Sequence, residues 1–471
     1  MQAAQARGCT ARHKRLMLEE SWWFTPTKNT TRGYGWGPYY SWIGSSFWMI
    51  AFCVSKISAL LRGIIRSYTA RQPWNLLRTI MGCLSSKPQT SATDEAEPIE
   101  INTVEDVITV TKGRGLSKLD LAANEPSEDC EEGQLLSKGL DLMAGVPESA
   151  FTQCTHVTEF TAKKSELSEI GEGLGNLVLL QVLDLSENEL TALPAAIGLL
   201  TALETLDVSE NAITALPAEI GQLTALQTFS AFKNQLKQLP AELGQCQSLT
   251  DLNVFNNKIL KLPPSLGQLA ELVEVNMGGN KLKTLPKLDS WGKVKELRIH
   301  QNTLISQVLP SFAPLTSLTM LKMDFNPAMS ELPDFGGSCL ALEHVECNNC
   351  NITELPSAEA LGALTELRVL NAQNNSISEL PALRNASLDT LNVSGNKGLR
   401  ALPDVSGCSA LRVLFVQGCG MQHIDGANEG LSGLERCLVM DNAFDEESEQ
   451  TIDKLRAVCT GNGGWLRPEQ E

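Results

Sequence analysis

"LQVLDLSENELTALP" (residues 180–194) recurs with small changes along the chain and decides its fold. The next copies are "LETLDVSENAITALP" from 203, "LQTFSAFKNQLKQLP" from 226 and "LTDLNVFNNKILKLP" from 249. An Asn returns at a strict step of 23 residues at positions 188, 211, 234, 257 and 280. The step then becomes irregular through Asn302, Asn326, Cys350, Asn375, Asn396, Cys419 and Asn442. One earlier copy begins at Val157 and has Ser165 in this slot, which makes thirteen copies in all.

The repeat predicts a solenoid, because no single copy could bury its own leucines and stacked copies bury them together. The pattern L-x-x-L-x-L-x-x-N-x-L resembles the leucine-rich repeat family over roughly residues 157–445. The resemblance implies a curved α/β solenoid with a parallel β-sheet on the concave face and short helices or loops on the convex face. The Asn slot is expected to face inward and to satisfy backbone groups between neighbouring coils.

The variable half of each copy narrows the resemblance. "ALPAEIGQLTALQTF" from 215 is similar to the intracellular 23-residue subclass, which occurs in scaffolds that bind Ras-type GTPases and phosphatases. A protein partner, such as a small GTPase or a phosphatase, is therefore what the resemblance implies.

Both ends of the array are expected to be capped, since an open solenoid end exposes its core. Residues 104–156 read as a degenerate capping repeat, "VEDVITVTKGRGLSKLD", followed by an acidic insertion. Residues 446–471 contain Ile452, Leu455 and Val458 at helical spacing, which predicts a helix over the last coil and then a tail.

Residues 1–80 differ in composition from the rest of the chain. They hold all four Tyr, six of the eight Trp, and eleven Lys or Arg against two acids. The remaining 27 basic and 53 acidic residues give residues 81–471 a formal charge of −26. Three interpretations fit this basic, aromatic-rich segment: a membrane anchor at residues 42–61, an organelle-targeting leader, or an upstream region that is not part of the functional protein.

"MGCLSSKPQT", which begins at Met81, favours the third interpretation. It has the form of an N-myristoylation signal, and Gly82 can be acylated only if translation begins at Met81. One myristoyl chain anchors a protein only marginally, and the linker 81–103 is acidic rather than polybasic. Cys83 is therefore the predicted second anchor, through palmitoylation. This places the protein in the cytoplasm, peripherally on the inner face of a membrane.

The sequence offers no recognisable catalytic group. Its five His residues are scattered, and no phosphate-binding glycine loop follows a strand. Cys347 and Cys350 form a C-x-x-C but occupy a core slot and an Asn slot, and no second ligand pair completes a zinc site. The thirteen Cys, dispersed at coil positions, suggest a reduced, intracellular protein. We expect no cofactor, no metal and no small-molecule substrate, and the acidic charge argues against nucleic acid.

The binding surface is predicted from positions between and just after the strand leucines, which project onto the concave face. Along the array these positions change from acidic to aromatic and then to basic, and aromatic and Arg side chains are typical anchors of interfaces. The predicted protein-binding residues are Phe232, Lys233, Phe255, Asn256, Arg298, His300, Lys322 and Phe325. The alternative for Phe232 and Phe255 is that they only cover neighbouring coils.

Together these features predict a non-enzymatic adaptor or scaffold in intracellular signalling, tethered by N-terminal acylation, with a protein partner on its concave face. The alternative is a soluble regulatory subunit of an enzyme, such as a phosphatase or a small GTPase regulator, without a tether. A third class, an enzyme, would require a catalytic group that the sequence does not display.

Overall fold

The computed structural model describes residues 103–121, 145–335 and 337–466. The chain divides after Ala96 into two units, and every described residue belongs to the second, Glu97–Glu471. The expected membrane segment 42–61 and the expected lipidation sites Gly82 and Cys83 lie outside the described residues. Among the described helices, none combines the length and the apolar character that crossing a bilayer requires.

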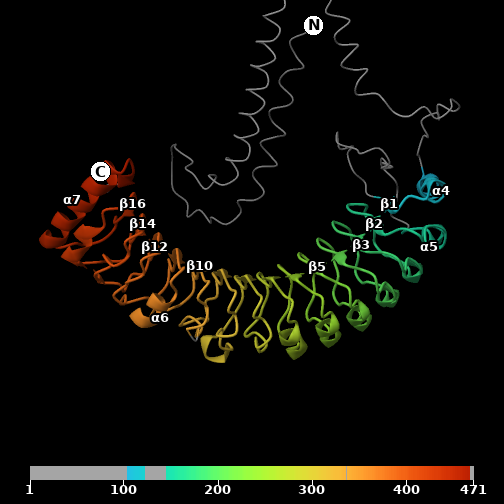
Figure 1. Cartoon of the computed structure of the whole chain (residues 1–471), viewed down its shortest axis with the longest axis horizontal. Helices are drawn as coiled ribbons and strands as arrows, with labels where there is room; N and C mark the ends of the chain where they lie inside the picture. Colours follow the sequence, from blue (N-terminus) through green and yellow to red (C-terminus); the bar gives the residue numbers. More distant parts are fainter. Residues whose placement is uncertain (1–102, 122–144, 336, 467–471) are drawn as a thin grey trace, which may run out of the picture. The chain divides into compact units, whose positions relative to one another are not determined.

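Fifteen short strands form one parallel sheet, in the order β1 to β12, then β14, β16 and β17. In Figure 1 the second unit curves with these strands on its inner side and the short helices on its outer side. This confirms the predicted α/β solenoid. The strands are β1 (Lys118–Asp120), β2 (Glu159–Thr161), β3 (Val182–Asp184), β4 (Thr205–Asp207), β5 (Thr228–Ser230), β6 (Asp251–Asn253), β7 (Glu274–Asn276), β8 (Glu296–Arg298), β9 (Met320–Lys322), β10 (His344–Glu346), β11 (Val369–Asn371), β12 (Thr390–Asn392), β14 (Val413–Phe415), β16 (Arg436–Leu438) and β17 (Trp465–Leu466).

The strands of the large sheet from β1 to β16 stay in register because each presents one buried apolar side chain at its centre. Leu183 of β3 lies beside Leu206 of β4, and Phe229 of β5 continues the row. All three side chains are completely buried. Burial of one such side chain is worth about 1.5–3 kcal/mol. The stacking of the coils therefore supplies the driving force for folding that a single coil lacks. Each coil is named below after its strand.

Short helices cover the outer side of the solenoid. The regular part carries η1 (Glu172–Asn176), η2 (Ala195–Leu199), η3 (Ala218–Gln222), η4 (Ala241–Gln245) and η5 (Pro264–Gln268). The other helices are α4 (Val104–Arg114), α5 (Glu148–Gln153), η6 (Ser306–Val308), α6 (Ala358–Ala363), η7 (Gly426–Gly430) and α7 (Glu446–Gly461), and a small second sheet pairs β13 (Ala401–Leu402) with β15 (His423–Ile424). In the regular part the helices pack tightly: a Cβ on Gly198 would lie 2.8 Å from Glu219 Cβ, and one on Gly221 would lie 2.8 Å from Glu242 Cβ.

The Asn slot joins each coil to the coil before it. The Nδ2 group of Asn257 donates to the carbonyl of Ala231 in the preceding coil at 2.9 Å and to Val254 in its own coil at 3.1 Å. Its Oδ1 atom accepts from the backbone nitrogen of Leu236 in the preceding coil at 3.0 Å. The same acceptance from the preceding coil occurs at Asn188, Asn211, Asn234, Asn257, Asn280, Asn302, Asn326, Asn375, Asn396 and Asn442.

Cys replaces Asn where the preceding coil needs no acceptor. Before Cys350, the repeat carries a one-residue bulge, and the backbone nitrogen of Met329 donates within its own coil to the Asn326 carbonyl at 3.0 Å. Before Cys419, the backbone nitrogen of Leu399 likewise donates within its own coil, at 2.9 Å. An amide oxygen in either slot would lack its usual donor, so a side chain without a strong acceptor suffices there.

The two ends of the array are closed by helices. Residues 104–114, which the sequence analysis placed in a degenerate repeat, form α4 instead, because Thr103 and Asp106 form a capping box at its start. After α4, β1 pairs in parallel with β2, as the strands of the repeats pair with one another. At the other end α7 buries Ile452 and Leu455, and β17 then adds a last strand to the sheet.

Candidate functional site on the concave face

From the β2 coil to the β16 coil, one backbone position just after the strand of the large sheet adopts the left-handed conformation. It directly precedes the Asn or Cys slot, and in most coils a polar residue or Gly occupies it, as Asn256 (φ 54°) and Asn374 (φ 55°) illustrate. Within the described coils the aromatic residue at this position is Phe325, with φ of 55°. A left-handed residue with a large side chain costs about 1–3 kcal/mol, and Asn is favoured there.

The Phe325 ring is also exposed, with 47% of the residue accessible to solvent. Burial of the ring therefore does not fully offset the free-energy cost of the left-handed backbone. A strained backbone that holds an apolar ring in solvent is a feature of sites that bind something.

Two aromatic rings, Phe255 and His300, contact each other on the same concave face. The Phe255 and His300 rings lie 5.4 Å apart between centroids with an interplanar angle of 30°. They come from the β6 and β8 coils, and Gly278 of the β7 coil lies beneath the imidazole, where a Cβ would be 2.5 Å from His300 Cε1. The absence of a side chain at Gly278 thus gives the two rings room to approach each other.

His300 has an unusual electrostatic environment. Burial lowers its pKa to about 4, and the cations of Lys322 and Arg298 act in the same direction. The ring is therefore neutral at physiological pH. Its Nδ1 atom is buried, and no hydrogen-bond partner for it is found among the described residues. A buried polar atom without a partner is costly, so the fold holds this ring in place against that cost.

The basic end of the predicted surface is not a free positive patch. The Arg298 guanidinium pairs with Glu296 on the same strand, and Lys322 Nζ lies 2.9 Å from a carboxylate oxygen of Glu346 on the neighbouring strand. The predicted change from acidic to basic residues was wrong in this respect, because it omitted Glu296 and Glu346. This part of the face carries alternating, locally compensated charges.

Asp324 lies at the centre of these charges and is only 4% exposed. Lys322 Nζ is 3.9 Å from its carboxylate, and Asn348 Nδ2 donates to it at 3.3 Å. Burial, and to a lesser extent the Glu346 carboxylate, raise the pKa of Asp324 to about 6, although Lys322 acts against them. The residue directly before Phe325 is thus an acid, Asp324, whose carboxyl group the fold shields from water.

The other predicted residues lie on the β5 and β6 coils. Phe232 is half-buried, and Lys233 Nζ lies 5.8 Å from the centroid of its ring. The Lys233 ammonium also pairs with Glu210 at 3.0 Å. Asn256 is exposed at its left-handed position. Phe232 and Phe255 are thus half-buried, while the one predicted aromatic residue that stands out in solvent is Phe325.

We call Phe255, Arg298, His300, Lys322 and Phe325 the concave cluster. The residues that the sequence analysis missed are those that neutralise or support it, above all Glu296, Glu346 and Gly278. A signal for the two acids existed, because the first and last positions of each three-residue strand share one face.

The C-x-x-C pair shows no sign of a reactive or metal-binding role. Burial raises the pKa of Cys350 to about 11 and that of Cys347 well above its ordinary value. Metal ligation and nucleophilic attack need the thiolate, which burial disfavours here. Within the described residues, no three or more His, Cys, Asp or Glu side chains group to hold a metal ion.

Comparisons with known proteins bear on the fold. A model of a leucine-rich repeat region matches residues 156–237, and no curated protein matches the sequence. A leucine-rich repeat protein of Leptospira interrogans is similar at 25% identity over 75% of this chain and 90% of its own, with a TM-score of 0.57. The leucine-rich effector YopM of Yersinia pestis is similar at 25% identity over 71% and 80%, with a TM-score of 0.53.

An internalin of Listeria monocytogenes, at 18% identity over 80% of this chain and 92% of its own, has a TM-score of 0.55 and shares the fold alone. The repeat pattern, the fifteen-stranded parallel sheet and these similarities agree. The described part of this chain has the fold of a leucine-rich repeat solenoid.

Proposed function

We propose that this chain is a non-enzymatic scaffold that holds a protein partner on its concave face, at the concave cluster. The fold itself suggests a protein-interaction scaffold. The observation that carries the location is Phe325, an exposed aromatic ring at a left-handed backbone position where other coils use polar residues or Gly. Exposed aromatic side chains of this kind are typical anchors of protein interfaces.

The chemistry of the cluster describes the partner. Phe325 calls for an apolar side chain on the partner, and the charged side chains of the neighbouring strands call for polar groups around it. Arg298 and Lys322 are already paired with acids. They therefore help to orient a bound partner more than they attract it from a distance. We therefore infer a partner whose contact surface mixes apolar and polar side chains and whose net charge can be positive or negative.

The test is affinity purification with the full chain and two matched variants. Phe325→Asn removes the ring and keeps the left-handed backbone. Asp441→Asn changes the same position of the β16 coil, where φ is 57°, and serves as the control. We expect the partner recovered by the wild type and by Asp441→Asn to be lost with Phe325→Asn. Equal recovery by all three proteins would contradict the proposed site.

The membrane tether is a separate part of the proposal and rests on the sequence around Met81. Myristoylation of Gly82 and palmitoylation of Cys83 would place the scaffold on the cytoplasmic face of a membrane, with two lipid chains giving the stable attachment that one does not. Mass spectrometry of the native N-terminus decides this point. A peptide that begins with acylated Gly82 supports the tether, whereas an N-terminus upstream of Met81 would contradict it and leave residues 42–61 as the candidate anchor.

A further inference from the structure

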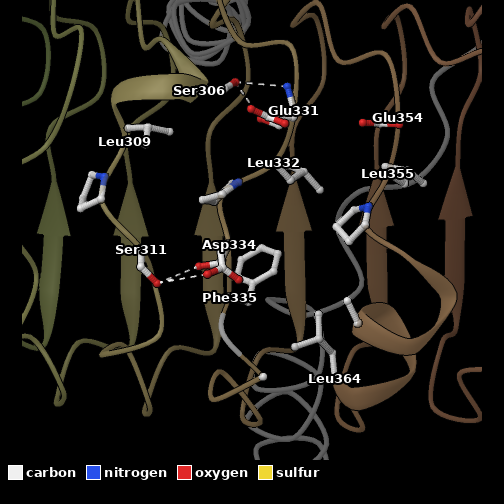
Figure 2. A pocket seen from close by; sticks show the side chains of 15 residues that line it. Ser306, Leu309, Ser311, Glu331, Leu332, Asp334, Phe335, Glu354, Leu355 and Leu364 are labelled. Carbon is white, nitrogen blue, oxygen red and sulfur yellow. Dashed lines mark hydrogen bonds between the residues drawn. The ribbon is translucent and has the colours of Figure 1, made fainter.

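A pocket of about 440 Å³ opens on the outer side of the β8, β9 and β10 coils, away from the concave cluster. Three Leu-Pro steps of successive coils line it: Leu309-Pro310, Leu332-Pro333 and Leu355-Pro356. Figure 2 shows Glu331 and Glu354 at one end of the pocket and Leu364 at the other. Its volume falls within the range of about 300–1,000 Å³ that is usual for ligand pockets.

The pocket exists because the outer ladder of short helices is interrupted. From η1 to η5 the coils pack so closely that a Cβ on Gly198 or Gly221 would collide with the next coil. Around the pocket this contact is lost, since a Cβ on Gly337 or on Gly362 would meet nothing within 4 Å. The one-residue bulge before Met329 and the replacement of a 3-10 turn by α6 change the path of these coils and leave the gap.

The walls of the pocket are held in place by short polar contacts. The Ser306 hydroxyl accepts from the backbone nitrogens of Ser330 and Glu331 at 3.0 and 3.1 Å and donates to the Glu331 carbonyl at 2.9 Å. Ser311 Oγ lies 3.5 Å from a carboxylate oxygen of Asp334. These bonds join the β8 coil to the β9 coil, so the pocket is preformed rather than produced by a ligand.

The lining has two chemical parts. The Leu-Pro steps and Leu364 provide an apolar floor, while Glu331 and Glu354 are exposed acids at one end. Asp334, beside Ser311, is a third exposed acid of the lining. Within the described part of the chain neither Glu331 nor Glu354 has an ion-pair partner. Two carboxylates above an apolar floor complement a cation attached to an apolar side chain.

We propose that this pocket is a second binding site, for a peptide segment of a partner protein that places a large apolar side chain next to Lys or Arg. The apolar side chain fills the space between Leu332 and Leu355, and the basic group reaches Glu331 and Glu354. This site lies on the opposite side of the coils from the concave cluster, so the scaffold could hold two partners at once. Its ligand is basic and apolar, unlike the mixed surface that the concave cluster accepts.

The pocket can be filled or recharged without touching the core. Ala360 is exposed on α6 and lines the pocket, so Ala360→Trp occupies the space. Glu354→Lys reverses one charge of the acidic end. Glu379 is exposed at the same step of the β11 coil, "SELP" at 378–381, and is outside the pocket, so Glu379→Lys is the matched control.

The experiment selects random twelve-residue peptides displayed on phage against the full chain, after depletion of the library on the Ala360→Trp variant. We expect the enriched peptides to pair Leu, Ile, Phe or Met with Lys or Arg within a few positions. Their affinity should fall about tenfold or more with Glu354→Lys, as expected for a like-charge contact, and stay within about twofold with Glu379→Lys and Phe325→Ala.

The proposal is overturned if depletion leaves no peptide that binds the wild type better than Ala360→Trp. It is equally overturned if the enriched peptides lack basic residues, or if Glu354→Lys and Glu379→Lys weaken them alike. The Phe325→Ala variant separates this site from the concave one, since a loss of peptide binding there would place the peptides on the concave face.

Discussion

The ring centroids of Phe255 and His300 lie 5.4 Å apart, and the coil between them has Gly278, which carries no side chain, at this position. The stack joins the β6 and β8 coils on the concave face and fixes the imidazole in a half-buried place where its pKa falls to about 4. Gly278 is therefore a positioning residue for the concave cluster, and its effect can be measured through His300.

Gly278→Ala should displace the imidazole, because the new Cβ would lie 2.5 Å from Cε1 of His300. We expect the pKa of His300 to rise from about 4 toward the ordinary value of 6.5 as the ring moves into water. Histidine resonances followed by NMR against pH report this directly. Gly292→Ala is the control, since a Cβ there meets only ordinary contacts. An unchanged titration in Gly278→Ala would show that the glycine does not hold the ring.

Phe325→Asn should stabilise the protein while it removes partner binding. Asn adopts the left-handed conformation more readily than Phe, and the half-exposed ring loses little buried surface. We expect an increase in the free energy of unfolding of about 0.5–1 kcal/mol in urea titrations. Phe325→Ala removes the ring without favouring the left-handed backbone and should gain less. If Phe325→Asn is instead the less stable variant, the ring packs more than its exposure indicates.

Asp324 should make stability depend on pH in an uncommon direction. Its pKa is raised in the folded protein to about 6 from an ordinary 3.8, so the native state gains stability as pH falls through 6 toward 3.8 and loses it as pH rises. Asp324→Asn should therefore be more stable than the wild type at pH 7.5, by up to about 2–3 kcal/mol. The difference should shrink by pH 4.5. Urea titrations at the two pH values measure it, and a constant difference would contradict the raised pKa.

His300 acts in the opposite direction over nearly the same pH range. Its folded pKa is lowered to about 4 from 6.5, so the stability it contributes is present above pH 6.5 and is lost as pH falls toward 4. The two residues partly cancel in the wild type. In Asp324→Asn we therefore expect a steeper loss of stability between pH 6.5 and 4 than in the wild type, which the same titrations reveal.

The Asn slots should not be interchangeable with the Cys slots. Asn257→Cys leaves the backbone nitrogen of Leu236 without its acceptor in the interior, which should cost about 1–3 kcal/mol. Cys350→Asn should bring no comparable gain, because Met329 already donates to Asn326 and the new amide oxygen has no donor. Thermal unfolding of both variants checks this. A clear stabilisation by Cys350→Asn would contradict the link between the bulge and the cysteine.

The sequence was sufficient for the fold because burial repeats with the leucines, and stacking is the only way to bury them. The Lys322–Glu346 pair also follows from the repeat, since the two residues end neighbouring strands and lie side by side in the sheet. The roles of Gly278 and Phe325 can be recognised only in the structure. The role of Gly278 depends on which ring lies above it, and the role of Phe325 depends on its backbone dihedral angle φ. The outer pocket arises from departures from the repeat, so the repeat itself could not predict it.

The most direct test of the central claim is photocrosslinking from the concave face to the partner. Benzoylphenylalanine is placed at position 325 and, in a second protein, at Leu199, which is 56% exposed on η2 of the outer face. Both proteins are incubated with the partner recovered by affinity purification and are irradiated. The account predicts a covalent adduct from position 325 and none from position 199. An adduct from position 199 alone would move the partner to the outer face and contradict the proposed site.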